Sequence, residues 1–243
     1  MPQSTFRNHI LKALAPADFA LVRPLLHSVI LGVKTQLVAA NAPIKYVYFP
    51  ETGVASVVAA MSRERQSEVG VIGREGMTGL ALVLGQDKSP DQTYIQIAGS
   101  GWCLSAPMLG AALAESSTFR DTLLRYAYTF MVQLSRTSLV NSHSKLEERL
   151  ARWLLMVHDR VDSNRIELTH GFLAVMLGTR RPGVTTAVQM LEYRGHISAK
   201  RGALEIRDRA GLVNLSNGAY GEEEQRAFRQ LLATHPEPVS RTG

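Results

Sequence analysis

One segment of the chain, residues 169–195, restricts the possible folds more than any other. An apolar run with helical spacing ends at Gly178, and glycine commonly follows the last residue of a helix. A second helix is predicted over about 181–193, with Pro182 in its first turn, where the missing N–H of proline costs little. Its buried face is predicted to consist of Val184, Val188 and Leu191. The segment therefore predicts two short helices joined by a tight turn.

The polar residues around this turn suit contact with DNA. Thr169 and Thr179 can cap the two helices, because a threonine hydroxyl accepts from an unpaired N–H of the first turn. Arginine can hold a guanine edge or a phosphate through two N–H groups, and threonine and glutamine can reach phosphates or bases. Residues of these types fall mainly off the buried face: Arg180, Arg181, Thr185, Thr186 and Gln189. A helix-turn-helix is the prediction, and an ordinary helical hairpin with solvated arginines is the alternative.

The residues after the helix pair favour the first interpretation. Two short β-prone runs, 196–199 and 203–207, flank Lys200, Arg201 and Gly202. They predict the basic hairpin, or wing, of a winged helix, and a solvated turn is the alternative. Positive charge is also densest here: residues 145–211 carry 12 basic and 8 acidic side chains, and the longer segment 1–144 carries 12 and 9. Phosphate binding requires such a basic surface.

The first half of the chain has a different sequence pattern. After a helical lead-in over 5–31, short β-prone runs are separated by turn residues. The predicted strands are 35–39, 46–49, 54–60, 68–72 and 94–97. Strands of this length and spacing predict a small antiparallel barrel or roll. Within it, a loop over 72–79 has three glycines, which permits either close approach to an anion or a plain bend before a short helix.

Residues 116–142 contain neither glycine nor proline and predict a helix of about 25 residues, roughly 37 Å long. An apolar stripe runs along it at alternating spacings of four and three: Leu123, Ala127, Phe130 and Leu134. We expect this stripe to join two copies of the chain, and packing on the chain's own barrel is the alternative. A hinge is expected at 141–144, followed by another helix over 145–159.

Several functions are disfavoured by composition. The single cysteine, Cys103, excludes an intramolecular disulfide, and it cannot alone hold an iron–sulfur cluster or a cysteine-rich zinc site. We find no metal spacing among the histidines, no nucleophile–base set and no nucleotide-binding glycine loop, so neither a cofactor nor enzymatic activity is expected. The chain shows no signal pattern and no apolar run of about 18 residues, which indicates a cytoplasmic protein without a membrane span.

The order of these parts resembles the Crp/Fnr family of bacterial transcription regulators over roughly residues 20–211. The segments that carry the resemblance are LGTRRPGVTTAVQMLEYRGHISAKRG, IGREGMTGLALVLG and YVYFPETGVASVV. It implies an α+β fold with an antiparallel β-roll of the double-stranded β-helix type, a dimerisation helix and a C-terminal winged helix-turn-helix. The expected divisions are a sensor roll over 1–115, the helix over 116–142, the DNA-binding domain over 143–219 and a tail over 220–243.

The resemblance also implies roles for single residues. Arg180, Arg181, Pro182 and Thr186 match the family's DNA-reading positions, and Thr169, Thr179 and Thr185 match positions suited to phosphate contacts. Arg181 falls where the cyclic-AMP receptor has a guanine-reading arginine. Pro182 replaces a glutamate that can accept from a cytosine amino group, so we expect a different target sequence.

The sensor part departs from the cyclic-nucleotide binders of this fold. Glu75, between Gly73 and Gly76, matches their ribose-binding glutamate. Gln92 and Thr93, however, stand where they have an arginine followed by serine or threonine for the cyclic phosphate. Because neutral glutamine cannot make the bidentate charged contact of arginine, the roll is expected to be a ligand-free scaffold or to bind another effector.

The sequence therefore predicts a homodimeric, sequence-specific regulator of transcription that binds double-stranded DNA, and RNA polymerase as well if it is an activator. The alternative is a cyclic-nucleotide-responsive protein that binds its ligand at the 73–79 loop. From Tyr220 the tail is expected to form a short amphipathic helix that includes Phe228, Leu231 and Leu232.

Overall fold

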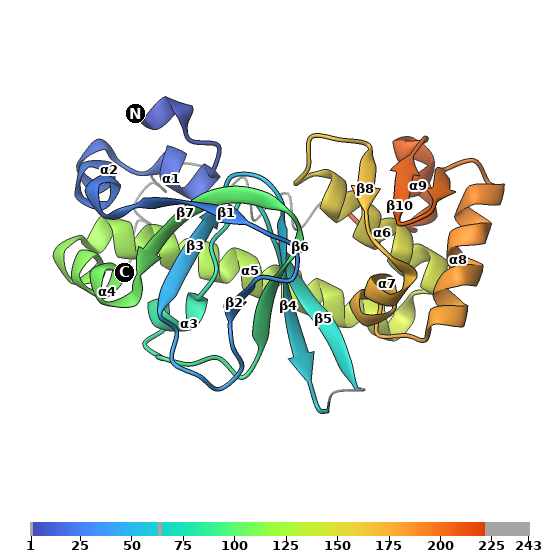
Figure 1. Cartoon of the computed structure of the whole chain (residues 1–243), viewed down its shortest axis with the longest axis horizontal. Helices are drawn as coiled ribbons and strands as arrows, with labels where there is room; N and C mark the ends of the chain where they lie inside the picture. Colours follow the sequence, from blue (N-terminus) through green and yellow to red (C-terminus); the bar gives the residue numbers. More distant parts are fainter. Residues whose placement is uncertain (1, 63–64, 222–243) are drawn as a thin grey trace, which may run out of the picture.

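The computed structural model describes residues 2–62 and 65–221, which form a β-roll, one long helix and a smaller mixed domain (Figure 1). The lead-in consists of short helical pieces: η1 (Gln3–Thr5), α1 (His9–Ala13), α2 (Pro16–Val22) and η2 (Arg23–Leu25). The predicted helical lead-in over 5–31 is wrong at its end, because β1 (His27–Leu31) is a strand paired with β7 (Gly99–Ser105). Only Leu31 of β1 is buried, so its pattern has no alternation that would indicate a strand.

The roll consists of two antiparallel sheets, with strand orders β1-β7-β3 and β2-β6-β4-β5. Its remaining strands are β2 (Gln36–Val38), β3 (Tyr46–Pro50), β4 (Val54–Ala60), β5 (Gln66–Ile72) and β6 (Gln92–Ile97). The five predicted strands correspond to these five, and β1 and β7 were not predicted. Two further helices belong to this part of the chain: α3 (Leu80–Val83) and α4 (Ala106–Glu115).

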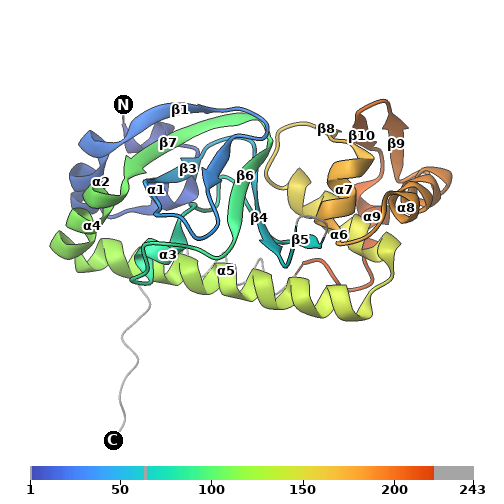
Figure 2. The same ribbon diagram turned by 60° about the horizontal axis from the view of Figure 1, so that its bottom comes forward.

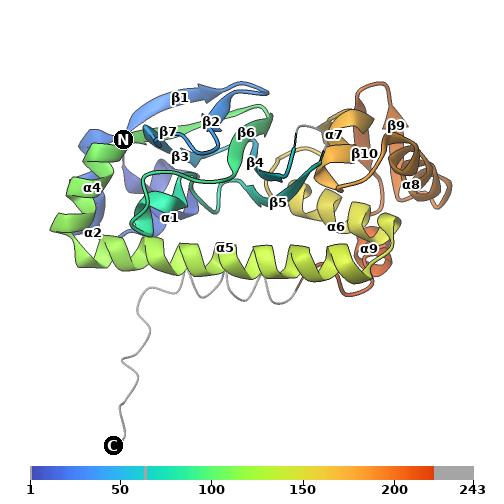
Figure 3. The ribbon, with the colours of Figure 1, turned by 90° about the horizontal axis from the view of Figure 1, so that it is seen from below.

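The long helix α5 (Ser117–His143) runs along the roll and on to the smaller domain (Figures 2 and 3). It begins where predicted, since the Ser116 hydroxyl accepts from the Phe119 N–H at 3.1 Å. The predicted hinge at 141–144 is too early, because α5 remains helical to His143. Only residues 144 and 145 separate it from α6 (Leu146–His158), whose Glu148 carboxylate accepts from the N–H of Lys145 at 3.0 Å.

The smaller domain combines α6 with a three-stranded sheet of order β8-β10-β9. Its other elements are β8 (Arg165–Glu167), α7 (His170–Met176), α8 (Arg181–Tyr193), β9 (Ile197–Lys200), β10 (Ala203–Ile206) and α9 (Arg209–Leu215). The predicted wing hairpin corresponds to β9 and β10, and β8 was not predicted. The amphipathic helix expected in the tail falls on residues 222–243, which lie outside the described residues.

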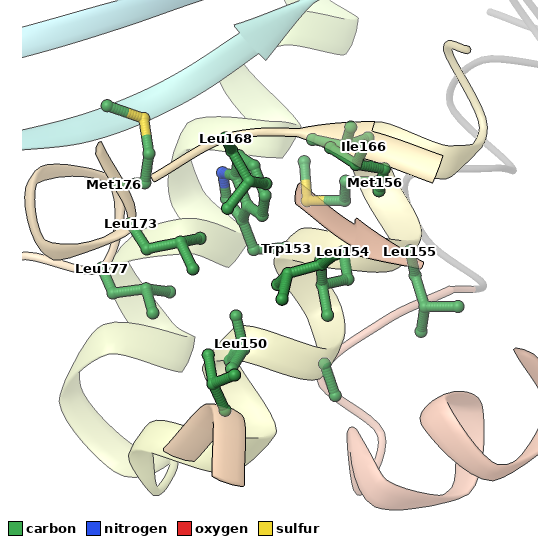
Figure 4. Close-up of a cluster of buried hydrophobic side chains, with 14 of the residues drawn as sticks. Leu150, Trp153, Leu154, Leu155, Met156, Ile166, Leu168, Leu173, Met176 and Leu177 are labelled. Atoms are coloured by element: carbon green, nitrogen blue, oxygen red, sulfur yellow. The ribbon is translucent and has the colours of Figure 1, made fainter. Parts of the chain in front are cut away.

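Buried side chains form three clusters that follow this architecture. One lies between the lead-in helices, the β1-β7-β3 sheet and the start of α5. Another fills the roll, where Phe130 of α5 packs with Ile72 and Ile95. The largest belongs to the smaller domain but also includes Val54, Val58 and Val71 of the roll. This cluster therefore joins the roll to the smaller domain, and Figure 4 shows some of its members from the smaller domain.

Asn8 fixes the lead-in to the roll. Its side chain is completely buried, and its Nδ2 donates to the carbonyls of Pro50 at 2.9 Å and Gly76 at 2.8 Å. Its Oδ1 accepts from the Leu11 N–H at 3.2 Å and so caps α1. One amide thus satisfies three backbone groups that water cannot reach.

We predict that Asn8→Ala lowers the free energy of unfolding by about 2–4 kcal/mol, because it leaves buried carbonyls without a donor. Urea denaturation measures the change. The control is Ser105→Ala, which removes the exposed cap of α4 and should cost only about 0.5–1 kcal/mol. A loss for Asn8→Ala no larger than that of the control would contradict this role.

Candidate nucleic-acid interface

The predicted helix pair is present as α7, a tight turn and α8 (Figure 1). The Thr169 hydroxyl caps α7 as expected, accepting from the Phe172 N–H at 3.3 Å. Gly178 adopts φ +54°, the left-handed conformation that ends the helix. From α6, Arg149 donates to the Leu177 carbonyl at the same end. The turn is therefore held both by its own glycine and by the neighbouring helix.

The second cap was predicted wrongly. Arg180, not Thr179, is the N-cap residue of α8, and its side chain makes no capping bond. The half-buried Thr179 instead donates its backbone N–H to the Ala174 carbonyl, as part of the turn. The start of α8 consequently has no side-chain cap, and a helix N-terminus in this state can bind an anion through its N–H groups.

The two faces of α8 differ sharply. Its inner face packs into the core and consists of Val184, Ala187, Val188 and Leu191, which confirms the predicted buried face. An exposed row lies on the outer face: Arg181, Pro182, Thr186, Gln189 and Tyr193. Tyr193, 93% exposed, was missed by sequence reasoning, although it continues the spacing from Pro182 through Thr186 and Gln189. The helix α8 lies at the end of the molecule away from the roll (Figure 3).

Two of the threonines are already hydrogen bonded. The Thr185 hydroxyl donates to the Arg181 carbonyl at 3.1 Å, and that of Thr186 donates to the Pro182 carbonyl at 3.2 Å. The half-buried Thr185 also contacts His170 Nδ1 at 3.1 Å, which links α8 to α7. Each hydroxyl must rotate away from its carbonyl before it can donate to a phosphate.

The wing carries unequal positive charges. Glu205 is paired with Lys200 at 3.6 Å and with Arg207 at 2.9 Å, so the charge of Lys200 is partly neutralised. Arg201 is exposed at the tip, where Gly202 adopts φ +75°. Within residues 2–62 and 65–221, Arg180, Arg181 and Arg201 have no acidic partner. These three guanidinium groups make the candidate surface basic.

The glycine loop contacts the smaller domain. Glu75 Oε1 is 2.8 Å from Arg160 Nε, both side chains are largely buried, and Glu75 also accepts from the Gly73 N–H at 3.0 Å. A Cβ atom at Gly73 would lie 2.6 Å from the Arg160 side chain, and one at Gly76 would lie 2.0 Å from the Tyr126 hydroxyl. These glycines are therefore needed for close approach to the chain's own side chains.

The candidate effector residues are not gathered in one place. Glu75 lines a cavity of about 140 Å³ together with Tyr126 and Arg160, but neither Gln92 nor Thr93 lines it. Gln92 instead faces Gln66, with 3.4 Å between their side-chain amides, and Thr93 is buried in β6. The arrangement does not support a cyclic-nucleotide site built from this set.

The stripe predicted for dimerisation faces inward. Leu123, Ala127 and Phe130 are buried. Leu123 packs in the cluster shared by the lead-in helices and the β1-β7-β3 sheet, and Phe130 and the partly buried Leu134 pack in the cluster that fills the roll. They are therefore not available to a second copy, which corrects the expectation. A neighbouring apolar stripe is exposed instead: Leu124, Tyr128, Met131 and Leu139. The long helix has apolar residues on both faces, and the roll covers only one of them.

The contact between the roll and the smaller domain contains a buried glutamate that sequence reasoning also missed. Glu68 of β5 accepts from Trp153 Nε1 at 2.8 Å and lies 2.5 Å from the Ser56 hydroxyl. Ser56 is 2.6 Å from Gln96 Oε1, so a protonated Glu68 can donate to Ser56, which then donates to Gln96. Burial raises the pKa of Glu68 to about 7. The hydrogen bonds with Ser56 and Trp153 and the positive charges of Arg160 and Arg152 oppose this increase.

Other kinds of site find no support among the described residues. In residues 2–62 and 65–221, no three histidine, cysteine, aspartate or glutamate side chains gather as a metal site would need. None of the helices formed by that part of the chain is both long and apolar enough to cross a bilayer.

Together these parts define a class of protein, in which a winged helix-turn-helix is joined through a long helix to an antiparallel β-roll. The family model for the Crp-like helix-turn-helix domain matches residues 148–215, so this segment is similar to that domain. No curated protein matches the chain.

Several solved structures share the fold of about four fifths of this chain. A protein described as a Crp/Fnr-family transcriptional regulator from Eubacterium rectale has a TM-score of 0.67 and 17% identity over 84% of this chain and 96% of that one. FixK2 from Bradyrhizobium japonicum gives 0.65 and 17%, over 78% and 96%. CLP of Xanthomonas campestris, a c-di-GMP-responsive global regulator, gives 0.58 and 18%, over 79% and 99%. The predicted Crp/Fnr fold is confirmed.

The buried glutamate leads to a prediction about pH. Because folding raises the pKa of Glu68 from 4.5 to about 7, the folded protein keeps a proton that the unfolded chain loses between these values. The free energy of unfolding should therefore fall as the pH rises from about 5 to about 7.5, by on the order of 3 kcal/mol. Urea denaturation at several pH values measures this slope.

Glu68→Gln should remove that part of the slope, because glutamine is neutral throughout and still accepts from Trp153. The control Glu115→Gln removes an exposed carboxylate and should leave the slope unchanged. Equal slopes for the wild type and Glu68→Gln would show that Glu68 is not protonated in the folded protein.

Proposed function

We propose that this protein is a homodimeric, sequence-specific DNA-binding regulator of transcription, with α8 as its recognition helix. The observation that carries the proposal is the exposed row on the outer face of α8, which begins at Arg181, together with Arg180 at the N-cap position just before it. Neither arginine has an acidic partner in the described part of the chain, so both are available to DNA. A basic helix alone would be weak support for DNA binding. This helix is followed by the β9–β10 wing and lies in the segment that matches the Crp-like helix-turn-helix domain.

The proposed DNA contacts divide between two tasks. Arg181, in the first turn of α8, is proposed to read a guanine through two N–H groups of its guanidinium. Arg180 contacts a base or the backbone, and Thr169, Thr179 and Thr185 contact phosphates. The other proposed DNA contacts are Thr186 and Gln189 on α8 and Lys200 and Arg201 on the wing. Pro182 cannot accept a hydrogen bond from cytosine through its side chain, which sets the target apart from that of the cyclic-AMP receptor.

The exposed stripe of α5 supports the homodimer. Large apolar side chains rarely stay uncovered as a continuous stripe, and Tyr128 and Met131 are each 60% exposed. Leu124, Tyr128 and Met131 follow one another at spacings of four and three, which is the apolar spacing of a helix packed against its symmetry mate. The exposed positions that continue this spacing, 135, 138 and 142, are small serines. Two-fold symmetry would then present two recognition helices to half-sites one DNA turn, about 34 Å, apart.

Control by the roll is supported by the way the DNA-binding domain is held. Glu68 joins β5 to Trp153 of α6, and Glu75 of the glycine loop joins Arg160 at 2.8 Å. A change at either contact would alter the position of the DNA-binding domain relative to the roll. The roll is either a scaffold for this docking or the binding site of a ligand other than a cyclic nucleotide. RNA polymerase is a partner if the protein activates transcription, and the cytoplasm is its proposed location.

We predict that Arg181→Ala weakens binding to the target sequence by roughly 1–3 kcal/mol and relaxes the preference at one base pair. Fluorescence anisotropy on a site selected from random DNA, and on a scrambled duplex, measures both effects. Arg201→Ala at the wing tip is the control, and it should weaken both duplexes alike. If Arg181→Ala also weakened both duplexes equally, Arg181 would be a phosphate contact.

A second prediction concerns the dimer. Met131→Glu should weaken self-association on the order of 100-fold, because it places two carboxylates in an apolar interface. Sedimentation equilibrium measures the dissociation constant, and circular dichroism checks that the variant is folded. Ala114→Glu, which adds the same charge on the exposed side of α4, should leave the dimer intact. A folded Met131→Glu variant with unchanged association would place the interface elsewhere.

A further inference from the structure

A groove of about 770 Å³ lies between the roll and the turn of the helix-turn-helix. One wall is formed by the end of β4 and the start of β5, including Arg65, Gln66 and Ser67. The other is formed by α7 and the turn, including Thr179 and Arg180. The walls touch, since a Cβ atom at Gly178 would lie 2.9 Å from Ser67 Oγ. Residues proposed to contact DNA therefore share a groove with the sensor roll.

The charges in this groove suit an anionic chain. Arg65 and Arg180 are exposed, and neither has an acidic partner in the part of the chain that the structure describes. Among the described residues that line the groove, Asp91 is the opposing charge, so these charged side chains sum to one net positive charge. Side chains of Thr179, Gln66 and Ser67 add groups that can donate to phosphate oxygens.

We propose that the DNA backbone passes along this groove and that Arg65 of the roll contacts a phosphate next to the one held by Thr179 and Arg180. The roll would then be part of the DNA-binding surface as well as the support of the DNA-binding domain. The inference rests on the proposed DNA binding, which already places Thr179 at a phosphate, and it assigns Arg180 to the backbone rather than to a base. Continuity with that surface favours DNA over an acidic protein as the occupant.

The test compares Arg65→Ala with wild type in DNA binding over about 50 to 300 mM salt. Loss of one phosphate contact per protomer should lower the affinity roughly three- to tenfold, by a similar factor for target and scrambled DNA. The plot of log affinity against log salt should also become less steep by about one for each protomer bound. Arg65→Lys keeps the charge and should retain most of the affinity and slope. Lys45→Ala removes an exposed charge of the roll that does not line the groove, and it should change neither.

Three outcomes would overturn the inference. Unchanged affinity and slope in Arg65→Ala would show that the roll does not reach DNA. Higher affinity would show that this edge of the roll obstructs DNA. Unchanged DNA binding with lost transcription would assign the groove to a protein partner. If the wild type itself showed no salt-dependent binding to DNA, the proposed function would fail first, and that result is distinct from all three.

Discussion

The structure depends above all on the burial of Trp153 between two parts of the chain. Its indole lies in a core that joins α6 and α7 to strands β4 and β5, and its N–H finds an acceptor in Glu68 at 2.8 Å (Figure 4). Apolar contact supplies the attraction, and the buried carboxyl restricts how the two parts can fit, because both polar groups must remain paired. The same core holds the helix-turn-helix next to the roll, with the groove between them, and leaves the outer face of α8 exposed.

The glycine loop gives this docking a second point of attachment. Glu75 would be free to meet a ribose in a nucleotide-binding roll, but here it holds Arg160, while Arg74 donates to the Arg160 carbonyl at 2.9 Å and pairs with Asp162 at 2.8 Å. The charged side chains of the loop, Arg74 and Glu75, are thus bound to the smaller domain. In this chain, contacts with the smaller domain take the place of contacts with a ligand. Our proposal that the roll controls DNA binding follows from this difference.

Local pattern was enough to predict some elements and not others. The bounds of α8 and its inner face, including Val184 and Leu191, follow from helical spacing within one segment. The inward and outward faces of α5 could not be separated, since Phe130 and Met131 are both apolar and only the position of the roll decides which is covered. Glu68 was missed because a glutamate in a strand is usually exposed, and its burial depends on Trp153, 85 positions away.

Selection of binding sites from a random DNA library tests the central claim most directly, because it requires both sequence reading and two-fold symmetry. The account predicts enrichment of an inverted repeat with half-sites about one helical turn apart and with a half-site sequence unlike that of the cyclic-AMP receptor. Failure to enrich any sequence, or recovery of that receptor's own half-site, would contradict it.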